Sequence, residues 1–201
     1  LSKLLNTPVE RGPDELKDLP LYFVKQAHKI DLSHYDVKIF AEIVDAPNVS
    51  VDEVVKRAYY YKENGANVID IGCLPDTPFA HMEDIIRTLK QEGFLVSIDS
   101  LQTDDLLRGA KAGADYVAPC LSLPEQTSRI VGAFAENGLE CGLMPYSTKF
   151  SSSLYGPYRD TVQSSLGLKR KDYQFDFSDS EQALQQMDSD LKQGAAMTIV
   201  K

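Results

Sequence analysis

A glycine ends five polar stretches of this chain, and each time the chain then runs directly into a short apolar segment. Glycine just past a helix end adopts the left-handed conformation that stops the helix. Short apolar segments in that place are typical of buried strands. Alternating helices and strands predict right-handed crossovers and a parallel sheet buried on both faces. The glycines are Gly65, Gly93, Gly113, Gly138 and Gly194.

The spacing of these units predicts six strands within 201 residues. We interpret them as an α/β fold, a TIM (β/α)8-type barrel of which about six units are present, in preference to an open doubly wound sheet. Two helix starts carry a capping box, a hydroxyl followed three residues later by glutamate, at 50–53 and 178–181. The predicted strands are 37–44, 67–73, 94–99, 115–119, 139–145 and 195–201.

The two ends of the chain differ from the repeating part. Residues 1–35 precede the first predicted strand, and 15–29 can form an amphipathic helix interrupted at Pro20. We predict an N-terminal helical arm or cap over 1–35 and a partial barrel over 36–201. Because the chain begins with Leu and stops inside an apolar run, we interpret it as a segment of something longer. The open edge of six units leads us to expect a homo-oligomer.

Charge and composition limit the partners. The chain has 21 Lys and Arg against 30 Asp and Glu, a net charge of −9 that repels phosphate backbones and anionic lipid. It has no apolar run long enough to span a membrane and no signal peptide at its start. We therefore expect a cytoplasmic protein with a small-molecule substrate and without nucleic acid or membrane partners. Its three cysteines form no CxxC pair, so the sequence predicts neither a disulfide framework nor a structural zinc site.

In a barrel, the residues at the carboxyl ends of strands and in the following loops form the site. Lys149 and Lys201 follow consecutive predicted strands. Two lysines in a partly desolvated barrel mouth lower each other's pKa, which leaves one free amine able to form a Schiff base with a carbonyl. The alternative is that both lysines are exposed and have no role. Asp99, at the end of its strand, is better placed to contact a ligand than Asp70, which lies within one.

Residues 139–201 resemble porphobilinogen synthase, also called 5-aminolevulinate dehydratase. The resemblance implies that Lys201 is the Schiff-base lysine, that Lys149 is the second active-site lysine, and that further residues bind substrate: Arg159, Arg170, Gln174, Tyr155 and Ser147. The family also implies a divalent metal, but its cysteine-rich metal site has no counterpart here, so we predict no metal ligands and no certain cofactor. The motifs are MPYSTKF at 144–150, LYGPYRD at 154–160, RKDYQ at 170–174 and GAAMTIVK at 194–201.

Residues 37–115 instead resemble dihydropteroate synthase-like proteins. This second resemblance implies that Asp99 contacts a pterin, in a mouth formed with Asp45 and Asp76. Together the two resemblances describe a mosaic of two barrel families, with the changeover between 113 and 139. The motifs are AEIVDAP at 41–47, IDIGCLPDTP at 69–78 and SIDSL at 97–101.

Three functions therefore stay open at the level of the sequence. The first is a lyase that condenses two 5-aminolevulinate molecules through a lysine Schiff base, as in tetrapyrrole biosynthesis, and that is inactive if the barrel is truncated. The second is a pterin-binding or one-carbon metabolism protein. The third is a non-catalytic barrel fragment or chimera.

Overall fold

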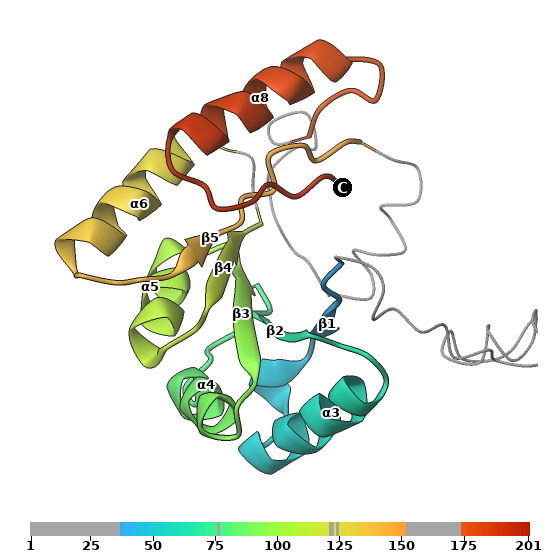
Figure 1. Cartoon of the computed structure of the whole chain (residues 1–201), viewed down its shortest axis with the longest axis vertical. Helices are drawn as coiled ribbons and strands as arrows, with labels where there is room; N and C mark the ends of the chain where they lie inside the picture. Colours follow the sequence, from blue (N-terminus) through green and yellow to red (C-terminus); the bar gives the residue numbers. More distant parts are fainter. Residues whose placement is uncertain (1–36, 76, 121–122, 124, 152–173) are drawn as a thin grey trace, which may run out of the picture. The chain divides into compact units, whose positions relative to one another are not determined.

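The computed structural model describes residues 37–75, 77–120, 123, 125–151 and 174–201 (Figure 1). The chain divides into two units, Leu1–Val37 and Lys38–Lys201, and the described residues lie almost wholly in the second. The helical arm expected over 1–35 lies outside the described residues and stays a prediction. No helix in the described part of the chain is long and apolar enough to cross a membrane.

Strands and helices alternate along the second unit, and the strands form one sheet in the order β1-β2-β3-β4-β5. Every neighbouring pair is parallel, which confirms the predicted α/β architecture. The elements are β1 (Phe40–Ile43), η2 (Ala46–Asn48), α3 (Val51–Glu63), β2 (Val68–Gly72), α4 (Met82–Gln91), β3 (Leu95–Ser100), α5 (Thr103–Ala112), β4 (Tyr116–Pro119), α6 (Gln126–Glu136), β5 (Gly142–Leu143) and α8 (Ser180–Lys192).

The sheet is curved like part of a barrel wall. Phe40 on β1 and Tyr116 on β4 share one face of the sheet by register, and their ring centroids are 5.7 Å apart. In a flat sheet these strands would be separated by about 14 Å, three times the spacing of neighbouring strands. The side chains on this face therefore converge, as they do toward the axis of a TIM-type barrel. We call this the inner face.

The outer face of the sheet is apolar and is covered by helices. Ile71, Ile98 and Val117 alternate with the inner-face residues and are fully buried in the core. Helices α3, α4, α5 and α6 pack one against the next along the sheet (Figure 1). Gly109 brings α5 close to β3, because a Cβ at this position would lie 2.7 Å from Cγ1 of Ile98. The helix-strand-helix order of the sequence thus produces one continuous core between sheet and helices.

The local signals at the helix ends are largely confirmed. Gly113 follows α5 with φ 106°, and the other four glycines singled out above also have positive φ. The hydroxyl of Ser50 accepts a hydrogen bond from the Glu53 backbone N–H at 3.2 Å, as expected for the start of α3. The expected cap at Ser178 is wrong by one residue. Asp179 caps α8 instead, because its carboxylate accepts from the Gln182 N–H at 3.0 Å.

The sixth predicted strand, 195–201, is present only as a fragment. Among the described residues it forms one isolated parallel bridge, between Thr148 and Val200. The backbone bonds that would extend the ladder are irregular, since Ala196 and Met197 both donate to the Leu143 carbonyl. The segment nevertheless runs beside the continuation of β5, and this position matters for the site.

Candidate functional site

The bridge between Thr148 and Val200 brings the two predicted lysines together. In parallel pairing the next residues along, Lys149 and Lys201, stand opposite each other. Backbone bonds fix this arrangement, because the Lys201 N–H donates to the Thr148 carbonyl and the Phe150 N–H donates to the Lys201 carbonyl, both at 2.8 Å. Side chains opposite each other in parallel strands project from the same face. The pairing therefore directs both amines to one side.

The aromatic ring of Tyr146 lies close to both amines. The Lys149 Nζ lies 5.3 Å from the centroid of the Tyr146 ring, and the Lys201 Nζ lies 5.5 Å from it. Both distances fall within the range of cation–π attraction. Lys149 is only 4% exposed, and its amine also donates to the Cys120 backbone carbonyl at 2.8 Å. The buried amine is thus held from two directions.

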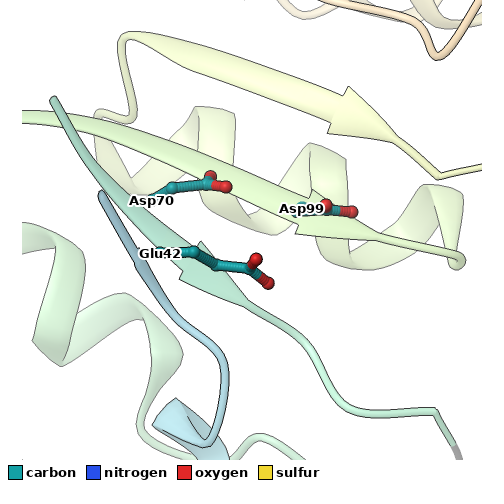
Figure 2. Close-up of side chains that lie close together, drawn as sticks. All are labelled: Glu42, Asp70 and Asp99. Atoms are coloured by element: carbon teal, nitrogen blue, oxygen red, sulfur yellow. The ribbon is translucent and has the colours of Figure 1, made fainter. Parts of the chain in front are cut away.

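Three carboxylates occupy the inner face beside these residues. Glu42, Asp70 and Asp99 come from β1, β2 and β3, and Figure 2 shows their side chains on one face of the sheet. One carboxylate oxygen from each lies within 4.8 Å of the other two. The strand register explains the grouping. Glu42 on β1 pairs with Asp70 on β2, and Asp99 is the next residue on the inner face of β3 after the one that pairs with Asp70. We call Glu42, Asp70 and Asp99 the carboxylate cluster.

The carboxylate cluster and the amine pair are parts of one site. The Tyr146 hydroxyl donates to Oδ2 of Asp99 at 2.8 Å, and the Cys120 thiol donates to the other oxygen of the same carboxylate. Tyr146 therefore contacts Asp99 through its hydroxyl, and its ring lies within cation–π distance of the two amines. The Ser97 hydroxyl donates to Asp70 one position lower on the inner face.

Burial and mutual repulsion make the cluster hold protons. Loss of water, and then the neighbouring charge of Asp70, raises the pKa of Asp99 from 3.8 to about 7. Burial also raises the pKa of Glu42 and of Asp70 above the usual carboxyl range. The hydrogen bond from Tyr146 acts in the opposite direction on Asp99, because it stabilises the ionised form. Near neutral pH, Asp99 is therefore able both to give and to take a proton.

The amine of Lys201 is shifted the other way. Partial loss of water and the positive charge of Lys149 lower its pKa below the ordinary value of 10.5. Asp99 and Glu42 oppose this shift, since negative charge favours the ammonium form. A lysine with a lowered pKa has a larger fraction of neutral amine, the form that attacks a carbonyl. The geometry is thus suited to Schiff-base chemistry.

Of the other predicted site residues, some lie near the amine pair and some fall outside the described residues. Ser147 is buried, and its hydroxyl donates to the Pro145 carbonyl at 3.4 Å. Gln174 is 9% exposed, and neither polar atom of its amide has a hydrogen-bond partner among the described residues. It adjoins the amine pair, because the next residue, Phe175, donates its N–H to the Lys149 carbonyl at 2.8 Å. The roles predicted for Tyr155, Arg159, Arg170 and Asp76 fall on positions outside the described residues.

Asp45, which was predicted to form a mouth with Asp99, pairs with a residue of α3. Asp45 accepts a hydrogen bond from the Arg57 guanidinium of α3 at 2.6 Å, and within the described part of the chain it is not among the clustered carboxylates. Asp45 follows β1 by two residues and is the N-cap of η2. Its predicted place in a pterin mouth with Asp99 stays a prediction.

Sequence reasoning missed Glu42. The available signal was an acidic residue in the middle of an apolar strand, the same signal that drew attention to Asp70. An ionisable group in such a place needs a partner or a function.

The described cysteines do not fit the metal site that the resemblance implied. Cys73, Cys120 and Cys141 are free thiols, and in the described ranges none belongs to a group close enough to hold one ion. Burial raises the pKa of Cys141 to about 12 and that of Cys73 well above its usual range. By distance alone, the carboxylate cluster could surround a cation, but Asp70 and Asp99 already accept bonds from neutral donors, and we assign no metal to it.

A curved parallel sheet with helices outside, and with an amine pair beyond its last strands, defines an α/β protein of the TIM-barrel class. The chain belongs to the delta-aminolevulinic acid dehydratase family, whose family model matches residues 95–201, more than half of its length. The match begins at β3 and contains Asp99, Tyr146 and both lysines. It begins upstream of the resemblance recognised over 139–201, and it leaves Glu42 and Asp70 outside.

Individual relatives agree with this assignment. The delta-aminolevulinic acid dehydratase of Escherichia coli is 39% identical over 93 residues, which cover 46% of this chain and 29% of the relative. A solved structure of the Toxoplasma gondii enzyme in complex with porphobilinogen has a TM-score of 0.63 at 22% identity, covering 82% of this chain and 62% of that one. The match thus spans less than two thirds of either relative.

The second resemblance is reflected in the fold. The 7,8-dihydropteroate synthase of Vibrio fischeri has a TM-score of 0.51 at 17% identity, covering 79% of this chain and 57% of that one. This likeness shows a shared fold. The matches to both kinds of barrel protein are consistent with a mosaic.

Proposed function

We propose that this chain carries the amine site of a porphobilinogen synthase-like lyase that condenses two molecules of 5-aminolevulinate. The observation that supports it is the position of the Lys149 and Lys201 amines over one tyrosine ring. In the proposed reaction Lys201 binds the ketone of one substrate molecule as a Schiff base. Lys149 holds or activates the second molecule.

The proposed division of labour follows from the surroundings of the two amines. The pKa of Lys201 is lowered by partial loss of water and by Lys149, which favours the neutral nucleophile. Lys149 is buried and bound to the Cys120 carbonyl, so its amine is fixed in position. A fixed amine is suited to orienting a second substrate molecule. The proposed Schiff-base lysine is therefore Lys201.

Substrate carboxylates and amino groups need polar partners as well. We propose that the amide of Gln174 binds substrate, because it is buried beside the Lys149 segment without a partner among the described residues. A buried amide without a partner costs free energy, which a bound polar ligand would recover. The roles proposed for Arg159 and Arg170 as carboxylate ligands rest on the family resemblance.

The pterin-binding alternative has less support. Both oxygens of Asp99 already accept hydrogen bonds, from Cys120 and Tyr146, and Asp45 pairs with Arg57 instead. The dihydropteroate synthase likeness, at 17% identity, shows the fold alone. The lyase is therefore the function we favour.

Borohydride trapping tests the proposal on the full chain. The protein is incubated with 5-aminolevulinate, reduced with borohydride, digested and examined by mass spectrometry. We expect a reduced adduct on Lys201 that is lost in Lys201→Arg and retained in Lys56→Arg, a matched change at an exposed lysine of α3. Absence of the adduct from both Lys201 and Lys149 in folded protein, or equal labelling of Lys56, would contradict the proposal.

A further inference from the structure

Glu42 has no assigned role in the proposed reaction, yet the fold makes room for it. Gly72 on β2 faces it, and a Cβ at this position would lie 2.9 Å from Oε1 of Glu42. Burial of a carboxylate is costly unless it interacts with other groups. Glu42 also lies outside residues 95–201, the part of the chain that matches the dehydratase family. Its role must therefore be inferred from its contacts here.

A short series of contacts connects Glu42 with the amines. Its carboxylate lies within 4.8 Å of a carboxylate oxygen of Asp99. Asp99 accepts from the Tyr146 hydroxyl at 2.8 Å, and the Tyr146 ring carries both amines at 5.3 and 5.5 Å. Glu42 is on β1 and the amines lie beyond β5, so only the curvature of the sheet brings these groups together.

We propose that Glu42 is a positioning residue for the amine pair: from its place beside Asp99 it controls the proton that Asp99 and Tyr146 hold next to Lys149 and Lys201. Glu42 does not touch substrate in this arrangement. It acts through Asp99, and Asp99 acts through the Tyr146 hydroxyl.

The inference rests on the proposed Schiff-base function, in which such a proton has a definite use. The neutral amine of Lys201 forms a C–N bond to the substrate ketone carbon as the carbonyl π bond opens, and one proton passes from the nitrogen to the oxygen to give the carbinolamine. The C–O bond of the resulting carbinolamine then breaks, and its oxygen leaves as water after it receives a proton from Asp99 through the Tyr146 hydroxyl. The nitrogen loses its remaining proton, which returns to Asp99. Atoms and charge balance, and no other reactant is needed.

The electrostatics agree with this role. Burial is the largest cause of the raised pKa of Asp99, and Asp70 and Glu42 raise it further, whereas Tyr146 and Lys149 lower it. Glu42 also raises the pKa of Lys201. Removing the charge of Glu42 should therefore lower the pKa of both Asp99 and Lys201. The titratable or charged groups that interact with Asp99 are Asp70, Glu42, Cys73, Cys120, Tyr146, Lys149 and Lys201.

The first measurement requires no substrate. Competitive acetylation of the full chain across a pH series, followed by mass spectrometry, gives the pKa of individual lysines. We expect Glu42→Gln to lower the pKa of Lys201, so that a shift of half a unit makes its neutral form about threefold more abundant at pH values below that pKa. Glu42→Asp should restore most of the charge effect. Glu63→Gln, at an exposed position on α3, should leave Lys201 unchanged.

The second measurement is the pH profile of the borohydride-trapped adduct. In Glu42→Gln both limbs of the profile should move to lower pH, because the two limbs are set by the pKa values of Lys201 and Asp99 and loss of the Glu42 charge lowers both. A residue with a merely structural role would lower the yield and leave the limbs in place. An adduct with an unchanged profile and unchanged acetylation in folded Glu42→Gln would overturn the inference. Shifted acetylation with no adduct in the unsubstituted protein would support the coupling and contradict the proposed function.

Discussion

Lys149 and Lys201, 52 residues apart in sequence, stand opposite each other in a parallel backbone pairing. The Thr148 N–H donates to the Ile199 carbonyl at 3.2 Å and the Lys201 N–H donates to the Thr148 carbonyl at 2.8 Å, so the register is fixed from both sides. This pairing directs both amines onto the ring of Tyr146. The predictions below concern what such close neighbours do to one another's protons and to the stability of the sheet.

Replacing Lys149 by Gln should raise the pKa of Lys201, because the positive charge of Lys149 is one of the causes that lower it. Competitive acetylation near pH 8 should then label Lys201 more slowly, and borohydride trapping should give less adduct. Lys149→Arg keeps the charge and should keep the Lys201 pKa low, and Lys56→Gln serves as the exposed control. An unchanged or lower pKa of Lys201 in folded Lys149→Gln would refute the coupling between the amines.

Asp99 should make the protein less stable as the pH rises. Its pKa is about 7 in the folded chain against an ordinary value of 3.8, so between these values the folded state binds the proton more tightly than the unfolded state. The stability gained from that proton is present at low pH and is lost as the pH rises from about 4 to about 7, at no more than about 1.4 kcal/mol per pH unit.

Urea denaturation across this pH range measures the effect. The free energy of unfolding should fall less steeply with pH in Asp99→Asn than in the unsubstituted chain. Asp188→Asn, at an exposed position on α8, should keep the original slope. Parallel slopes in the chain with and without Asp99 would show that this carboxyl titrates alike in the folded and unfolded states.

Gly72→Ala should destabilise the fold by about 1–3 kcal/mol, the usual range for overpacking. The new Cβ would lie 2.9 Å from Oε1 of Glu42 and 3.1 Å from the backbone Cα of Val44, and backbone cannot move aside cheaply. Gly132→Ala is the contrasting change. Nothing lies within 4 Å of a Cβ there, on the exposed face of α6, so this change should stabilise by about 0.5–1 kcal/mol. Urea denaturation that gives both variants the same stability would contradict the contact at Gly72.

Local patterns in the sequence were sufficient to predict most of the helices and strands. Gly113 and its counterparts stop helices because of their own backbone freedom, and Ser50 caps α3 through a bond within one turn. Such interactions join residues close in sequence, and so they can be read from the sequence. The cap at Asp179 was missed by one residue because neighbouring residues there, Ser178 and Asp179, are both able to accept the bond.

The sequence also placed Lys149 and Lys201 after consecutive strands, which is a matter of order along the chain. It could not show that segment 195–201 would pair with the chain through one bridge, because irregular backbone bonds between distant segments depend on the whole sheet. The same holds for the pairing of Asp45 with Arg57, which lies 12 residues further along the chain.

By itself, the sequence determined the alternation of strands and helices, the points where helices stop, and the presence of two lysines and several carboxylates at strand ends. Only the tertiary structure decided that Glu42 on β1 would lie beside Asp99 and reach the amines beyond β5 through Tyr146. The physical reason is that helix capping and hydrophobic period act over a few residues. The curvature and register of the sheet, which decide the neighbours on its inner face, are set by all strands packing together.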